Sequence, residues 1–426
     1  MVPRSRGRMS ATTQPRQTLT HDAWARMASE ASPSLLALWA DTREVYALLR
    51  DCDAPLLVST DVEDGGYPAL SPVRPAAAWF ERMVGDLWGH MAIGGIDQRP
   101  WLNHGRWPHS APMALRPEPA GAAETPEFPF SEELDQLPLG PVRGGIEPAA
   151  HLRLGVRGET IARLEARLGY THKGTLTLMR GKSPRAAARF AARLAGEATV
   201  AHSIAFARAT EAVLGCEVPP RALAFRDIMA ELERIACHLD VLSAMAEIAG
   251  FEILATRTAW RGETVRRAAN TAFGHRLMMD CIVPGGAAAD IAPGGGEAIG
   301  RALSGLAAER PQLLAAGPAE ARARDRLGEI DGSIRRVRIL LASLPAGAVS
   351  VPLPVASGEG LGFTKGPNGD IWHWLRLDHG QIASVFMCDP AWARWPELEA
   401  TMAGGQTDEL PLILASFGLS SSGVDL

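Results

Sequence analysis

The side chains best suited to chemistry in this sequence are a few histidines and tyrosines at the edges of regular elements. His151 stands directly before a run of alternating residues, and Tyr170 and His172 follow in a glycine-bounded turn. A neutral imidazole or phenol can donate a hydrogen bond and pass on a proton. Both turn residues can equally brace the turn. We expect His202 and His238, which lie in helical patterns, to be hydrogen-bonded core residues.

The cysteines do not form a metal-binding set. The five thiols are Cys52, Cys216, Cys237, Cys281 and Cys388, and no two have the C-x-x-C spacing. Cys237 adjoins His238, but neighbouring side chains on a helix point about 100° apart and cannot share one metal ion. Scattered single thiols suit a reducing compartment better than a disulfide framework.

Composition and hydropathy argue against two classes of protein. A net charge of −5 argues against a general nucleic-acid binder. The sequence contains no uncharged apolar run of about 18 residues, so we expect no membrane span. The opening segment, residues 1–17, is basic and polar, and we interpret it as a disordered tail in which Met9 is an alternative start.

Two helices with clear ends position the candidate residues. The first begins at Ser183-Pro184, ends at Gly215, and contains the run from Arg193 to Ala198. The second follows Pro219-Pro220 and keeps one apolar stripe to Gly250, a length of about 28 residues. A third helix, with apolar residues at 3, 4, 3, 4 spacing, is predicted over 327–341 as an antiparallel partner.

The remaining patterns predict an α+β protein with two domains. A disordered tail (1–17) precedes a small α/β domain (18–108), a proline-rich linker (109–139) and a mainly helical domain (140–426). The last of these opens with a β-hairpin, where alternating residues run from 152 to 168, and carries a small sheet near the end of the chain.

Several motifs, in the same order along the chain, resemble one protein family. Leu168 to Gly174 resembles an L-G-Y-x-H-R-G signature, and Glu231 to Leu239 and Gly274 to Gly286 resemble further signatures. These belong to the large subunit of membrane-bound nickel–iron hydrogenases of the formate hydrogenlyase or hydrogenase-4 type, and to the homologous D component of respiratory complex I. Trp79 to His90 resembles the C component of complex I. Arg143 departs from the hydrogenase pattern, because those proteins usually have a histidine at this position.

The thiolates of the hydrogenase centre are absent. The resemblance places its four cysteines at Ala195, Ala198, Ser420 and Gly423. A nickel–iron pair needs soft sulfur ligands, which methyl groups, a hydroxyl and glycine cannot replace. We therefore expect no nickel–iron centre and no hydrogenase activity, and no metal-ligating or catalytic residues are assigned.

Complex I uses the corresponding cavity for a quinone headgroup, and the resemblance implies such a site here. His151 matches the quinone-binding histidine, the tyrosine position falls on Gly196, and the aspartate position falls on Ile248 beside Glu247. The cofactor-binding candidates are therefore His151, Tyr170, Gly196 and Glu247. If this is right, Ala195 and Ser420 should face one another across a hollow under the His151 loop.

The implied function is that of a subunit in a membrane-associated NADH:quinone oxidoreductase or hydrogenase-4-like complex. The expected partners are a small iron–sulfur subunit and ion-translocating membrane-arm subunits, without nucleic acid. The expected location is peripheral, on the cytoplasmic face of the inner membrane. The alternative is a redox-silent scaffold that joins the iron–sulfur subunit to the membrane subunits.

Overall fold

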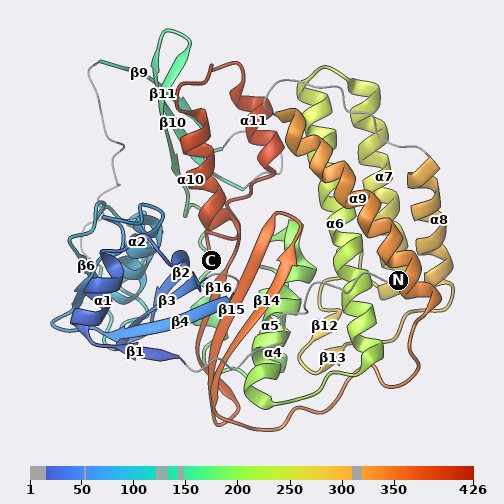
Figure 1. Cartoon of the computed structure of the whole chain (residues 1–426), viewed down its shortest axis with the longest axis horizontal. Helices are drawn as coiled ribbons and strands as arrows, with labels where there is room; N and C mark the ends of the chain where they lie inside the picture. The colour runs from blue at the N-terminus through green and yellow to red at the C-terminus, as the bar shows by residue number, and fades with distance from the viewer. Residues whose placement is uncertain (1–15, 52–53, 121–127, 129–132, 143–147, 309–318) are drawn as a thin grey trace. The chain divides into compact units, whose positions relative to one another are not determined.

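The computed structural model describes residues 16–51, 54–120, 128, 133–142, 148–308 and 319–426 (Figure 1). The described residues fall into two compact units. The mixed unit contains residues 16–177, 391–406 and 424–426, and the helical unit contains residues 178–390 and 407–423. Arg143, and most of the predicted tail, lie outside the described residues. The α+β fold class is confirmed.

The mixed unit begins with a four-stranded sheet in the order β1-β4-β3-β2. Its strands are β1 (Gln17–Leu19), β2 (Ser34–Ala40), β3 (Glu44–Asp51) and β4 (Ala54–Asp61). Only β1 pairs in parallel, with β4. Two small pairs follow, parallel β5 (Gly66–Pro68) with β6 (Met91–Ile93), and antiparallel β7 (His109–Ser110) with β8 (Glu118–Pro119).

Two helices belong to this part of the chain, α1 (His21–Ala28) and α2 (Ala77–Trp88). The large apolar residues of α2 are all buried, namely Trp79, Phe80, Met83, Leu87 and Trp88. Glu81 of the same helix is also buried and accepts backbone N–H bonds from Leu70 and Ser71. The acid in this motif therefore anchors the loop before the helix.

The predicted hairpin is present as β10 (His151–Arg157) and β11 (Thr160–Arg167), which pair antiparallel around Gly158. β9 (Asp135–Leu139), which comes from the predicted linker, adds a third strand beside β10. Helix α10 (Ala391–Met402) packs on β11, and its Glu399 accepts the backbone N–H of Ala166 at 2.6 Å.

The helical unit starts with a helix that the sequence predicts as continuous but that is broken in two. Short α3 (Thr175–Met179) precedes α4 (Pro184–Ala191), the 3-10 turn η1 (Gly196–Ala198) and α5 (Thr199–Leu214). The predicted start and stop are confirmed, because the Ser183 side chain caps α4 and Gly215 ends α5 with φ +58°. The break arises because the carboxylate of Glu233 accepts the N–H groups of Val200 and Ala201, which makes a new helix start.

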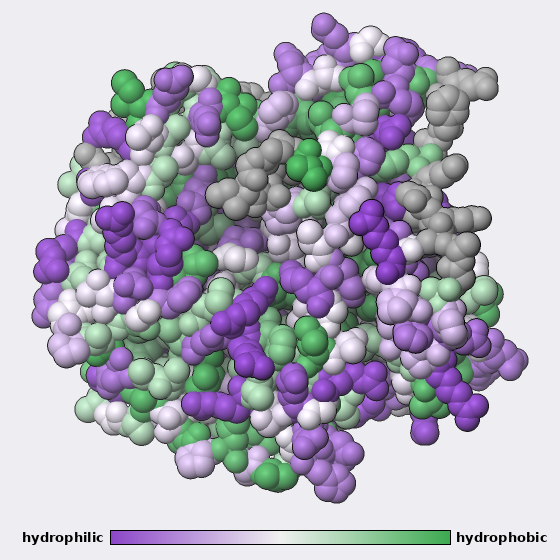
Figure 2. Space-filling view, turned by 180° about the vertical axis from the view of Figure 1, so that it is seen from behind, coloured by the Kyte–Doolittle hydropathy of each residue, from purple (hydrophilic) through white to green (hydrophobic). Residues whose placement is uncertain are grey.

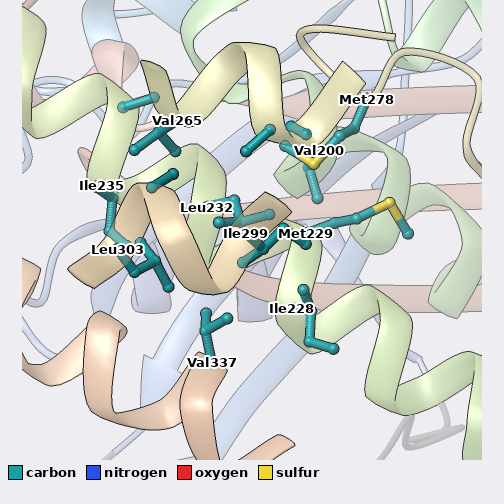
Figure 3. Close-up of a cluster of buried hydrophobic side chains, with 14 of the residues drawn as sticks. Val200, Ile228, Met229, Leu232, Ile235, Val265, Met278, Ile299, Leu303 and Val337 are labelled. Carbon is teal, nitrogen blue, oxygen red and sulfur yellow. The ribbon is translucent and has the colours of Figure 1, made fainter. Parts of the chain in front are cut away.

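Long helices form the main core. They are α6 (Pro220–Ile248), α7 (Glu252–Phe273), α8 (Gly295–Ala308) and α9 (Ala319–Ala342), with α11 (Leu410–Phe417) packed on α6 and α9. α6 has 29 residues, close to the expected length, and α9 is its predicted packing partner. Figure 3 shows the buried side chains that join these helices, among them Leu232, Val265 and Val337.

A small antiparallel sheet packs on α5 (Figure 1), formed by β14 (Gly358–Gly366), β15 (Gly369–Asp378) and β16 (Gln381–Cys388). A Cβ at Gly362 would lie 2.0 Å from the carbonyl oxygen of Ala205, and one at Gly360 would lie 2.1 Å from that of Ala209. Only glycine on β14 and small residues on α5 allow this approach. β12 (Ile282–Val283) and β13 (Gly286–Ala287) form a tight ribbon near α5 and α6.

The surface shows no sign of a spanning segment in the part of the chain that is described. No helix there is long and apolar enough to cross a membrane. On the face seen in Figure 2, hydrophilic residues are interspersed with small hydrophobic groups.

Candidate functional site

Two of the four positions that hold cysteines in the hydrogenases are filled by packed methyl groups. Ala195 is fully buried and Ala198 is nearly so. Both belong to a small apolar cluster with Ala201 and Ala205 of α5 and Ile371 of β15. The two positions that carry the first pair of thiolates in the hydrogenases are therefore part of the packing contact between α5 and the β14–β16 sheet.

The other two positions meet this region from the end of the helical unit. The Ser420 hydroxyl donates a hydrogen bond to the carboxylate of Glu197, between Ala195 and Ala198. A Cβ at Gly423 would lie only 2.3 Å from Cγ of Asp389. The two segments therefore come together as the motifs predict, but a carboxylate occupies the space of the fourth thiolate. Their position under the His151 loop stays a prediction.

A chain of buried polar side chains extends from this carboxylate. His202 Nε2 donates to Asp389 Oδ2 at 2.9 Å, and His202 Nδ1 lies 2.8 Å from His373 Nε2. Both rings are fully buried. Burial, and then the neighbouring His202, hold the pKa of His373 well below its usual value. His373 Nδ1 has no hydrogen-bond partner among the described residues, so the chain ends at a neutral imidazole with a free nitrogen.

Two further carboxyl groups stand at the start of α5. Burial, and then repulsion from Asp389, raise the pKa of Glu197. Burial raises the pKa of Glu233 to about 8, although two backbone N–H groups of α5 donate to it at 2.5 and 3.0 Å. Each carboxyl also disfavours the charge of the other, because Glu197 contributes to the shift at Glu233. Near neutral pH Glu233 therefore retains a proton that a free glutamate would release.

Glu197 and Glu233 line a cavity of about 150 Å³ inside the helical unit. The other lining residues come from η1, α6, α7 and the loop after α7, namely Gly196, Leu232, Ala236, Cys237, Asp240, Val265, Arg266, Ala269, Arg276, Leu277 and Met278. A cavity of about this volume accommodates a benzene ring in an engineered protein core. Its walls combine an apolar side with carboxyl and guanidinium groups, which can orient a small ring that carries hydrogen-bonding oxygens.

The residues next to Cys237 form a network of hydrogen bonds that holds the helices together. Burial raises the pKa of the Cys237 thiol to about 12, so this sulfur is a thiol rather than a thiolate. The neighbouring His238 donates to Glu329 at 2.8 Å and accepts from Arg326 at 2.9 Å. Arg326 also donates to the carbonyl groups of Ser416 and Phe417. His202 and His238 are therefore hydrogen-bonded core residues, as predicted.

These residues do not fit a nickel–iron centre. Two ligand positions are buried methyl groups, and a third is a glycine whose missing side chain would overlap Asp389. The fourth, Ser420, is already hydrogen-bonded to Glu197. Hard oxygen donors and apolar methyls do not replace four soft thiolates.

The four predicted cofactor-binding residues are distributed over both units. Gly196 lines the 150 Å³ cavity, whereas Glu247 is exposed on the last turn of α6 and does not line it. His151 opens β10 in the mixed unit, where its ring contacts Phe128 at 4.7 Å between centroids. Burial, and then two arginines, lower the pKa of His151. His151 Nε2 has no hydrogen-bond partner within the described part of the chain.

Tyr170 lies in the mixed unit beside a second cavity, of about 260 Å³. Its ring contacts His104 edge to face, with 4.4 Å between centroids. His172, from the same turn, hydrogen-bonds to the backbone oxygen of Asp425, and Gly169 N–H donates to the Asp425 side chain. These contacts tie the turn in place, which is the bracing role that the sequence left open.

Sequence reasoning missed Glu197, Glu233, Asp389 and His373. Glu197 carried a signal, since it is the single charge between Leu194 and Ala201 in a predicted core helix. Glu233 carried a weaker one, because Glu231 and Arg234 lie beside it in the sequence. Asp389 and His373 carried none, because their partner His202 is 187 and 171 residues away in the sequence.

Fold and site together resemble the large subunit of the nickel–iron hydrogenases, with other groups at the four positions where those proteins have cysteines. Residues 173–245 match the nickel-dependent hydrogenase family, and the resemblance that the motifs predicted is confirmed.

Curated relatives agree with this. The chain is 27% identical to hydrogenase-4 component G of Escherichia coli K12, over 84% of this chain and 75% of the relative. It is 26% identical to formate hydrogenlyase subunit 5 of the same organism, over 86% and 78%. Similarity to the C/D component of the NADH-quinone oxidoreductase of Methylococcus capsulatus is 25% identity over 48% of this chain and 39% of the relative.

A solved structure shows the same fold. The chain aligns with one protein of an archaeal membrane-bound sulfane sulfur reductase with a TM-score of 0.61 and 17% identity. The alignment covers 70% of this chain and all of that one.

Proposed function

We propose that this chain is a subunit of a membrane-associated respiratory oxidoreductase complex and contributes a quinone-type cavity. The observation that carries the proposal is the 150 Å³ cavity beside the four replaced ligand positions, with Gly196 in its wall. The relatives support the wider assignment, since their names describe components of hydrogenase, formate hydrogenlyase and NADH-quinone oxidoreductase.

The cavity has the donors that a quinone ring requires. A quinone presents two carbonyl oxygens and a flat apolar ring, so it needs hydrogen-bond donors beside an apolar wall. Glu197 in its protonated form and the guanidinium groups of Arg266 and Arg276 supply donors, while Val265 and Leu277 supply apolar surface.

Electrons would reach this cavity from a partner. The five cysteines are scattered along the sequence, whereas an iron–sulfur cluster is usually held by closely spaced cysteines. We therefore place the cluster in a small neighbouring subunit. We place this chain in the peripheral part of the complex, outside the membrane arm. His151 and Tyr170 remain candidates for quinone contacts within the mixed unit.

The test is quinone reduction by the purified complex, with a short-chain quinone as acceptor. Ala236→Leu narrows the cavity, whereas Ala302→Leu adds the same volume at an equally buried position that does not line it. We expect Ala236→Leu to raise KM for the quinone about tenfold or more, which corresponds to at least about 1.4 kcal/mol of lost binding. Ala302→Leu should leave KM unchanged.

Absence of quinone reduction in the parent complex, or equal effects of the two variants, would refute the quinone proposal. His151→Ala is a separate arm of the same assay, and an unchanged KM there would remove His151 from the site without affecting the cavity.

The second candidate is the redox-silent scaffold, which one observation favours. On α7, Ile253 is 78% exposed and Trp260 is 56% exposed, and a separation of seven residues puts both on one helix face. Such apolar residues are common in contacts between subunits. If Ile253→Asp and Trp260→Asp prevent assembly while the cavity variants change nothing, the scaffold explains the chain better.

A further inference from the structure

The space of the lost metal pair contains a new arrangement of acid and imidazole groups rather than an empty hollow. Asp389 fills the position of the side chain that Gly423 lacks, and Ser420 hydrogen-bonds to Glu197. From Asp389 a hydrogen-bonded chain continues through His202 to His373. Every member lies in the helical unit.

We propose that Glu197 is the acid–base residue of the cavity, and that the Asp389–His202–His373 chain tunes its proton affinity. The proposal deepens the proposed function and rests on it for the identity of the ligand, but its central claim concerns residues of this chain alone. The ligand it implies carries an oxygen that gains negative charge on reduction.

Position supports this role. Glu197 is the residue that belongs both to the cavity wall and to the replaced ligand cluster, because it lines the cavity and also accepts from Ser420. Asp389 interacts electrostatically with Glu197 and is hydrogen-bonded to His202. Two carboxylates so close cannot both ionise without cost. Asp389 accepts a hydrogen bond from His202, whereas burial and the charge of Asp389 raise the pKa of Glu197.

The remaining titratable groups around Glu197 come from three elements. They are Glu233, Cys237 and Asp240 of α6, Arg266 of α7, and Arg276 of the following loop. Burial is the largest influence on Glu197, and Asp389 strengthens its effect, whereas His202 and Ser420 oppose it by stabilising the ionised form.

The proton step is simple and balanced. When electrons from the partner subunit place negative charge on a ligand oxygen, the O–H bond of Glu197 breaks and a new O–H bond forms on that oxygen. Glu197 is left as a carboxylate, stabilised by the Ser420 hydroxyl. It regains a proton from solvent through the cavity, so no further reactant is consumed.

Infrared spectroscopy of the purified full chain, titrated with pH in the absence of quinone, tests the claim. The carbonyl stretch of the protonated Glu197 carboxylic acid should persist to higher pH than that of an ordinary glutamate. The band should lose intensity in Glu197→Gln, while exposed Glu252→Gln leaves it unchanged. The isosteric Asp389→Asn removes the repelling charge, so the Glu197 band should titrate at lower pH. His202→Gln should shift it in the opposite direction.

The two variants are expected to shift the titration of the Glu197 band in opposite directions. This separates tuning from general loss of structure, because unfolding would move the titration of both variants toward that of an ordinary glutamate. An unchanged band in Glu197→Gln, or shifts of the same sign in Asp389→Asn and His202→Gln, would overturn the proposal. Since no quinone is present, this outcome is independent of the KM assay. A positive infrared result with no quinone reduction would retain the acid–base site and reject the quinone.

Discussion

The carboxyl group of Glu233 makes the stability of the helical unit depend on pH in an unusual direction. Burial raises its pKa from 4.5 to about 8 in the native protein. The native state therefore binds the proton more tightly than the unfolded chain, and the free energy of unfolding falls as pH rises through this interval. One pKa unit corresponds to about 1.4 kcal/mol, so the full loss contributed by this group is on the order of 5 kcal/mol.

Glu233→Gln removes the titration and keeps the shape. Glutamine can still accept one of the two N–H bonds from Val200 and Ala201, but its amide group cannot accept the other. We expect the variant to be less stable than the parent at pH 5, by about 1–3 kcal/mol for the unsatisfied N–H group. At pH 8 the difference should shrink or reverse, because the parent then bears the cost of a buried charge.

The assay is urea unfolding of both proteins, followed by circular dichroism between pH 5 and pH 9, with exposed Glu252→Gln as the control. The decisive quantity is the difference in free energy of unfolding at each pH. If that difference is constant or grows with pH, the carboxylate is stabilised by its two N–H donors and by the start of α5, and the reasoning from burial is wrong.

Three further outcomes are expected in the helical unit. Arg226→Met should destabilise the protein by about 3–5 kcal/mol in urea unfolding, because it leaves the buried Glu211 carboxylate without its bidentate partner; replacing both residues by apolar ones should recover much of the loss. Gly423→Ala should lower the midpoint of thermal unfolding, because the added methyl overlaps Asp389; an unchanged midpoint would show that Asp389 has another position available. The buried Cys237 thiol should resist iodoacetamide at pH 8 in the native protein and react on unfolding; rapid native labelling would contradict its protonated state.

Local signals in the sequence predicted a large share of the architecture. A serine, a proline and a glycine marked the ends of the 183–215 segment, and periodicity alone gave the length of α6. What local reasoning could not find was the break before Thr199. The N–H groups there are satisfied by Glu233, which lies more than 30 residues further on, and no local pattern encodes that distance.

Local sequence patterns predicted even less of the candidate site than of the fold. The motifs correctly brought residues 195–198 and 420–423 together, because each was compared with a family signature. The groups that now fill the space lie elsewhere: Asp389 follows β16 and His373 is on β15. Asp389 fits only because residue 423 is glycine, and His373 meets a partner 171 residues away in the sequence. A single sequence does not reveal such pairs.

The fit between Asp389 and Gly423 also affects how this protein can change over generations. A mutation that restored cysteine at position 423 would meet the carboxylate already there, and a mutation of Asp389 alone would leave His202 without its acceptor. Either change alone would therefore disturb the packing or the hydrogen bonds of this cluster. A cysteine at position 423 would therefore need a compensating change at Asp389, and that change would in turn need a new hydrogen-bond acceptor for His202.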